Sequence, residues 1–155
     1  MKKIIGSLLC LFLVFITCGC VFTSKKPISA EEFKLTLSEK GFTIQDLTYQ
    51  FKKYDYIEKV YVAINEKTGY QVEFYDFNKS DVALSSFNKN KKKFQDSIND
   101  GALGKNETHG MFNKYSVTTG GKYKVVSRIE DTIVYLDVDK TYSDELQQIL
   151  EDLGY

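Results

Sequence analysis

The stretch from Lys114 to Val138, KYSVTTGGKYKVVSRIEDTIVYLDV, decides the fold of this chain. Polar and apolar residues largely alternate in three segments, which are separated by Gly120-Gly121 and by Glu130-Asp131. Alternation with a period of two predicts β-strands, and Gly-Gly suits a two-residue turn because both positions can adopt positive φ. Strands joined by such short turns must be antiparallel. We therefore expect three antiparallel strands over Lys114–Thr119, Lys122–Glu130 and Thr132–Val138.

A second set of alternating segments lies upstream. Glu58–Glu66 places Val60, Val62 and Ile64 on one face, and a turn at Lys67-Thr68-Gly69 separates it from Tyr70–Phe77. This arrangement predicts a second hairpin. A short strand is also expected over Phe42–Leu47, so the sheet should contain about five to six strands.

Three segments have the pattern of amphipathic helices. Ser29 and Glu32 form a capping box at the start of the first, and Gly41 followed by Phe42 indicates its end. The second covers Ser80–Ile98, and a similar helix begins near Ser143. The core residues expected on the second helix are Leu84, Phe87, Phe94 and Ile98.

These elements predict an α+β fold in which three helices cover an antiparallel sheet, in the order helix, strands, helix, strands, helix. Residues 29–155 are long enough to form a single domain with one core. Asn99–Met111 contains three glycines and no apolar period, so we expect it to be a mobile loop, and the only histidine, His109, lies in it.

The N-terminal segment has a different character. Lys2 and Lys3 precede the apolar stretch Ile4–Gly19, which is short for a membrane-spanning helix. Ile16-Thr17-Cys18-Gly19-Cys20 resembles the lipobox of bacterial lipoprotein signal peptides. This resemblance implies that Cys20 receives a diacylglyceryl group and that a signal peptidase cleaves after Gly19. The alternatives are modification of Cys18, an uncleaved anchor helix and an ordinary secretory signal.

We therefore expect residues 1–19 to be a lipoprotein signal peptide and residues 20–28 to be the lipidated cysteine and its tether. Two acyl chains are enough for stable anchoring. The expected location is the extracytoplasmic face of the cell membrane. Lys122–Ile129 and the ending Leu153-Gly154-Tyr155 resemble small uncharacterised lipoproteins of low-GC Gram-positive bacteria, a likeness that supports an envelope location and implies no activity.

Composition excludes several classes of function. The chain has 21 basic and 21 acidic residues, and removal of residues 1–19 leaves 19 basic residues against 21 acidic ones. This balance argues against nucleic-acid binding, which needs a cationic surface. After Cys20 no cysteine follows, so disulfides and thiol chemistry are excluded from the domain. We also find no hydrolase, zinc-protease, phosphate-loop or dinucleotide motif, and we expect no cofactor.

Carboxylates give only weak signals. The acidic run Asp137–Glu145 resembles a calcium loop, but its sixth position is Tyr142 and its twelfth is Gln148, where glycine and glutamate are required. We interpret the run as the end of a strand followed by an acidic helix start, and we expect no metal site. His109 is interpreted as an exposed loop residue, because a general base needs fixed geometry.

The candidate partner surface consists of Tyr49, Tyr54, Tyr56 and Arg128. Tyrosine is enriched at protein interfaces, and a lone arginine on the outward sheet face can pair with a buried acid or with a ligand carboxylate. The lysine run Lys89–Lys93 is interpreted as a solvated helix face, with an anionic polymer, lipid or acidic protein as the alternative.

These observations favour a non-enzymatic lipoprotein that binds a protein or an envelope component. The alternative is a small inhibitor or immunity-type lipoprotein that acts against a secreted hydrolase. A carboxylate-based envelope enzyme is the third hypothesis.

Overall fold

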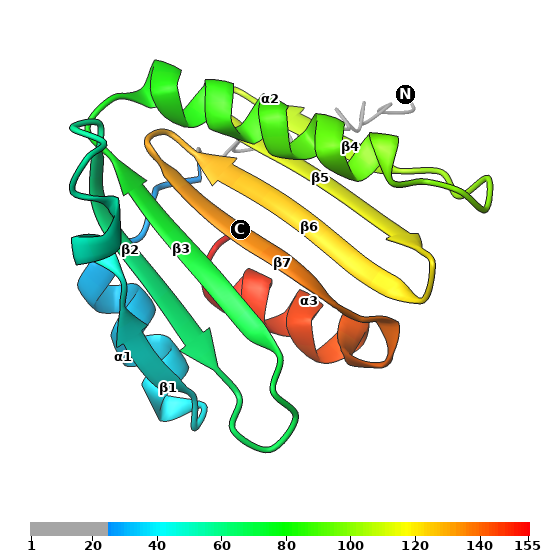
Figure 1. Ribbon diagram of the computed structural model, residues 1–155, viewed down its shortest axis with the longest axis horizontal. Coiled ribbons are helices and arrows are strands. Elements are labelled where there is room, and N and C mark those ends of the chain that lie inside the picture. Colours follow the sequence, from blue (N-terminus) through cyan, green and yellow to red (C-terminus); the bar gives the residue numbers. More distant parts are fainter. Residues whose placement is uncertain (1–24) are drawn as a thin grey trace, which may run out of the picture.

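The computed structural model describes residues 25–155, which form an α+β fold around one seven-stranded antiparallel sheet (Figure 1). The α+β class predicted from the sequence is confirmed. The elements in chain order are α1 (Ala30–Glu39), β1 (Thr43–Asp46), the 3-10 turn η1 (Thr48–Phe51), β2 (Ile57–Ile64), β3 (Gln71–Phe77), α2 (Ser80–Asp96), β4 (Lys105–His109), β5 (Phe112–Thr119), β6 (Lys122–Ile129), β7 (Thr132–Asp139), the 3-10 turn η2 (Lys140–Tyr142) and α3 (Ser143–Asp152).

The strands are arranged in the order β1-β2-β3-β7-β6-β5-β4. Most neighbours are successive along the chain and pair through short turns, as the alternating segments predicted. The exception is the pairing of β3 with β7, which places Glu73 opposite Tyr135 and Tyr75 opposite Ile133. This one long-range pairing joins the two halves of the sheet and brings residues from distant segments onto one surface.

The expected strand count of five to six was too low, because β4 occupies part of the segment expected to be a loop. Its sequence, Lys-Asn-Glu-Thr-His, has no apolar residue, so no hydrophobic alternation marked it. The strand pairs with β5 on one side only and forms an edge of the sheet. A polar edge strand is held by backbone hydrogen bonds and needs no buried side chains. His109 therefore lies at the end of a strand, with its ring stacked on Phe112 at 6.4 Å between centroids.

Helices cover both faces of the sheet. The α1/α3 face carries the larger core, which includes Phe33 of α1, Phe74 of β3 and Leu146 of α3. The α2 face carries a second cluster, in which Phe87 and Phe94 of α2 pack with Val126 and Ile133. In Figure 1, α2 lies in front of the sheet and α3 behind it.

Burial on both faces changes the pattern expected for β2. The sequence predicted a single apolar face of Val60, Val62 and Ile64, but every residue from Val60 to Ala63 is buried. The same holds for β6, in which Val125, Val126 and Ile129 are all fully buried. Central strands that are covered on both faces have continuous apolar runs.

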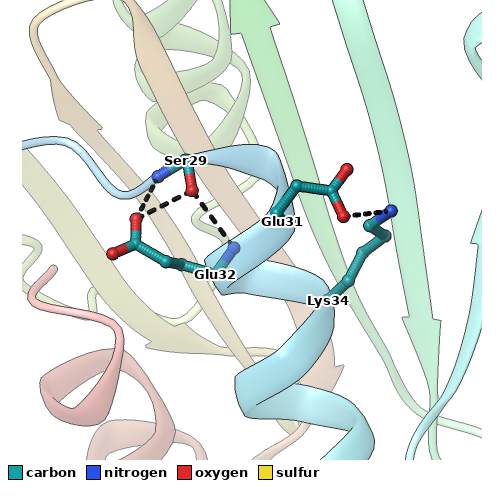
Figure 2. A network of polar contacts seen from close by, with 4 residues as sticks. All are labelled: Ser29, Glu31, Glu32 and Lys34. Atoms are coloured by element: carbon teal, nitrogen blue, oxygen red, sulfur yellow. Dashed lines mark hydrogen bonds and ion pairs between the residues drawn. The ribbon is translucent and has the colours of Figure 1, made fainter.

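The predicted capping box at the start of α1 is present (Figure 2). The Ser29 hydroxyl accepts a hydrogen bond from the Glu32 backbone amide at 3.2 Å, and the Glu32 carboxylate accepts one from the Ser29 amide at 2.7 Å. One turn of helix also brings the Glu31 carboxylate within 2.7 Å of Lys34 Nζ. The two capping-box bonds satisfy backbone amides that the start of a helix leaves without partners, and the ion pair is a separate contact between side chains.

α2 buries Ala83, Phe87 and Phe94, so two of the four predicted core residues are confirmed. Leu84 is 38% exposed because it lies beside the buried stripe, whose first member is Ala83. Ile98 lies beyond the end of the helix and is only partly buried. No helix within residues 25–155 is both long and apolar enough to cross a membrane.

Candidate functional site

An open groove of about 530 Å³ lies on the α2 face of the sheet, between α2 and the segment that leads from η1 into β2. We call it the aromatic groove. Its floor comes from β3 and β7, because the pairing of these strands sets their outward residues side by side. The residues that line it are Phe51, Tyr54, Tyr56, Ile57, Glu73, Tyr75, Phe77, Ser86, Lys89, Asn90, Lys93, Ile133 and Tyr135.

Five aromatic side chains form a continuous row in the groove. The distances between ring centroids along Tyr56, Tyr54, Phe51, Tyr75 and Phe77 are 5.6, 6.3, 6.2 and 6.4 Å. Such spacing is typical of aromatic pairs that are packed against one another. The row therefore has positions fixed by mutual contact, and most of its rings keep part of their surface open to solvent.

The floor of the groove contains one carboxylate, that of Glu73. The Tyr75 hydroxyl donates a hydrogen bond of 2.5 Å to Glu73 Oε2. Desolvation in the groove raises the pKa of Glu73, and the nearby Asp137 carboxylate acts in the same direction. Burial and the Glu73 charge also raise the pKa of Tyr75, so this phenol stays protonated and keeps donating to the carboxylate. The described lining has no second acid to form an acid–base pair with Glu73.

The wall formed by α2 is cationic. Lys89 and Lys93 are four residues apart on the helix and both line the groove. Lys91 donates instead to Asn106 Oδ1 at 2.7 Å, and Lys92 pairs with Asp96 at 3.1 Å. The run interpreted as a solvated helix face is largely exposed, and helical geometry turns its first and last lysines toward the groove.

Polar and aromatic groups pack together beside Tyr135, toward β6. The Phe94 ring lies 5.2 Å from the Tyr135 ring, and Lys124 Nζ lies 5.6 Å from the Phe94 centroid. Lys124 also donates to Ser97 Oγ at 2.9 Å and lies 3.8 Å from an Asp137 carboxylate oxygen. The Asp137 carboxylate therefore lies beside the Lys124 ammonium, whereas the contact described for the Glu73 carboxylate is the hydrogen bond from the Tyr75 phenol.

Of the predicted partner surface, Tyr54 and Tyr56 line the groove and Tyr49 does not. Tyr49 is 76% exposed on η1, and Lys52 Nζ lies 4.3 Å from its ring centroid. The sequence missed Glu73, Tyr75 and Tyr135. In the sequence these residues appear only as polar side chains at alternate positions of two apolar strands. The local sequence does not show that the two strands, β3 and β7, pair with each other.

Arg128 corrects another expectation. It was expected on an outward-facing sheet surface, but its side chain is 3% exposed beneath the N-terminus of α2. Its Nη1 donates to Asn113 Oδ1 at 2.7 Å and to the Met111 carbonyl at 3.1 Å, and its Nη2 donates to the Ser80 carbonyl at 3.2 Å and to Ser80 Oγ. It forms no ion pair with a carboxylate within residues 25–155. Arg128 therefore joins α2 to the sheet and does not belong to the groove.

The remaining site predictions have a simpler outcome. Cys20 and the expected signal peptide, residues 1–19, lie outside the described residues, so cleavage and lipidation stay predictions. In the described part of the chain, no three histidine, cysteine, aspartate or glutamate side chains are grouped so that they could hold a metal ion. No protein-family model, curated protein or solved structure matches the chain.

Proposed function

We propose that this protein is a lipid-anchored binding protein of the extracytoplasmic membrane face and that the aromatic groove is its binding site. The observation that carries the proposal is the row of five rings beside a desolvated carboxylate. Binding sites typically combine aromatic walls with a few placed polar groups in a concave surface. The groove has this composition, with Glu73, Asn90 and Ser86 as its polar groups.

Binding is favoured over turnover by the content of the groove. Glycoside hydrolysis by carboxylates generally uses two acids that flank the scissile bond. Glu73 is the only acid in the described lining, and the phenol of Tyr75 already occupies one of its oxygens. This supports a ligand site without catalysis.

The start of the described chain is compatible with an anchor that leaves the groove accessible. Lys25 Nζ lies 4.2 Å from the ring centroid of Phe112, which belongs to the core of the α1/α3 face. Cys20 precedes Lys25 by five residues, which span at most about 17 Å. A tether that approaches on the α1/α3 face leaves the opposite face, with the groove, free to meet a partner.

The anchor is tested by metabolic labelling of cells with a fatty acid. We expect the wild type to incorporate label and Cys20→Ser to incorporate none. Equal labelling of the two chains, or no labelling of either, would exclude lipidation at Cys20.

The groove is tested by capture of envelope material on the full-length protein in detergent. Tyr56→Ala and Tyr54→Ala should lose the captured material, whereas the matched control Tyr49→Ala, which changes an exposed tyrosine outside the groove, should retain it. Equal capture by all three variants would refute the groove as the binding site. A secreted enzyme that copurifies in stoichiometric amount would instead favour the inhibitor hypothesis.

A further inference from the structure

We propose that the ligand of the aromatic groove is an anionic glycan, a chain of sugar rings that carries carboxylate or phosphate groups. This inference rests on the proposed function and adds the chemical class of the ligand. Three features of the groove carry it: the row of rings, the acceptor on its floor and the charge of its α2 wall.

The row of rings suits an extended chain of sugars. The faces of aromatic rings are electron-rich and attract polarised C–H groups, which sugar rings present on their flat sides. The groove is open, and its accessible rings follow one another from Tyr56 through Tyr54 and Phe51 to Tyr75, while Phe77 is 4% exposed and supports the row from the core. A row of this kind can contact successive sugar units, whereas a compact ligand would touch only part of it.

The floor requires a ligand that donates hydrogen bonds. Only one Glu73 oxygen accepts from Tyr75, which leaves acceptor capacity on a carboxylate that the groove has already partly desolvated. An acyl chain would bury this carboxylate without compensation, and that is strongly unfavourable. Sugar hydroxyls and N-acetyl amides supply the missing donors.

The α2 wall favours a negatively charged ligand. Lys89 and Lys93 line the groove, and neither forms an ion pair within residues 25–155. Across the groove, Lys53 Nζ lies 4.9 Å from the ring centroid of Tyr54. Lysine is a flexible point charge that binds carboxylate and phosphate groups. The two lysines that line the groove, with Lys53 beside Tyr54 as a third nearby cation, disfavour a cationic peptide. The anionic groups of a glycan would lie beside these positive charges.

The test uses isothermal titration of the full-length protein in detergent with two matched pairs of oligosaccharides. The anionic probes are hyaluronan hexasaccharide and pentamannosyl phosphate, and their neutral counterparts are chitohexaose and mannopentaose. A glutamate hexapeptide supplies negative charge without sugar rings. We expect at least one anionic probe to bind about tenfold or more tightly than its neutral counterpart, and the peptide to show no binding.

Variants assign the binding to the groove. The double variant Lys89→Gln with Lys93→Gln should bind the anionic probe about tenfold or more weakly and the neutral probe with unchanged affinity. Tyr56→Ala should bind both probes more weakly. Lys67→Gln, at an exposed turn outside the groove, is the control for loss of charge alone and should have no effect.

The failure of this inference is distinct from failure of the proposed function. If no anionic glycan exceeds its neutral counterpart, or if the lysine variants bind like the wild type, the anionic-glycan ligand is wrong. If capture of envelope material still depends on Tyr56 in that case, the groove is a binding site for another ligand, and the proposed function stands. If the captured ligand proves to be protease-sensitive and the peptide competes for it, the ligand is a protein.

Discussion

The hydroxyl of Tyr155, the last residue of the chain, lies 2.5 Å from the hydroxyl of Thr132 at the start of β7. Thr132 donates its proton to the Ile129 carbonyl at 2.8 Å, so Tyr155 donates to Thr132. Burial raises the pKa of Tyr155 well above its usual range, and the phenol remains a donor. The bond joins the end of the chain to a central strand, and Gly154 permits the approach because its φ of 81° places the backbone in the left-handed region.

This relationship predicts that the C-terminal residue contributes to stability. Tyr155 is 1% exposed, and its ring fills space between α3 and the sheet. Tyr155→Phe should lower the free energy of unfolding by about 1 kcal/mol, through loss of the hydrogen bond. Tyr155→Ala should lower it by about 3 to 5 kcal/mol, because it also leaves a cavity. Urea titration measures both, and Tyr49→Ala is the control.

Comparable unfolding curves for Tyr155→Ala and Tyr49→Ala would contradict a core role for the last residue. Tyr49 is exposed, so its removal should change the free energy of unfolding by less than about 0.5 kcal/mol.

The second prediction concerns Arg128, whose guanidinium connects α2 with β5 through Ser80 and Asn113. Lysine cannot reproduce this fork, because its single ammonium cannot donate in two fixed directions. Arg128→Lys should therefore lower the free energy of unfolding by about 2 kcal/mol, measured by urea titration. Lys122→Ala, which removes an exposed cation from the same strand, should change it by less than about 0.5 kcal/mol.

A double-mutant cycle of Arg128→Lys with Asn113→Ala isolates one arm of the fork. The two changes should be less than additive, because each breaks the same hydrogen bond. Strict additivity would show that the contact between Nη1 and Asn113 contributes nothing to stability.

The sequence predicted correctly the elements that depend on a few neighbouring residues. The turn at Gly120-Gly121 and the capping box of Ser29 are set by the conformations and hydrogen bonds of neighbouring residues, and both are present. β4 was missed because a polar edge strand is defined by its partner β5 and not by its own side chains. The same limit explains why Val60 to Ala63 were expected to alternate, since only the packed structure covers both faces.

The groove shows the same division between local and long-range information. Tyr54 and Tyr56 were predicted because they are concentrated in one aromatic segment. Glu73 and Tyr135 could not be joined to them, because their proximity depends on the register of β3 against β7. That register follows from the pairing of two distant hairpins and has no sequence motif.

The third prediction concerns Gly104, which precedes β4. A Cβ atom at this position would lie 1.9 Å from the Tyr115 Oη and 2.3 Å from its Cζ. Tyr115 is buried, so its ring cannot move away freely. Gly104→Ala should lower the free energy of unfolding by about 2 kcal/mol and increase hydrogen exchange of the β4 amides.

The penalty should persist in a Tyr115→Phe background, since the ring carbon stays in place, and should shrink in a Tyr115→Ala background. If the penalty is the same in all three backgrounds, the steric explanation is wrong.

The fourth prediction concerns the effect of pH on stability through Asp76. Desolvation, with the Asp131 and Glu58 carboxylates nearby, raises the pKa of Asp76 from 3.8 to about 6. The folded state therefore holds this proton more tightly than the unfolded state does, so the contribution of Asp76 to stability falls as pH rises from about 4 to 6 and is constant above that. Asp76→Asn has no carboxyl group to ionise at this position, so the variant should not show this fall in stability with rising pH. Because the side chain is partly exposed, the variant should be more stable than the wild type by only about 1 kcal/mol at pH 8 and equally stable near pH 3.5. Thermal unfolding across this range measures the difference, with the exposed Asp55→Asn as control. A gain for Asp76→Asn that did not change between pH 3.5 and pH 8 would show that packing, and not ionisation of Asp76, causes it.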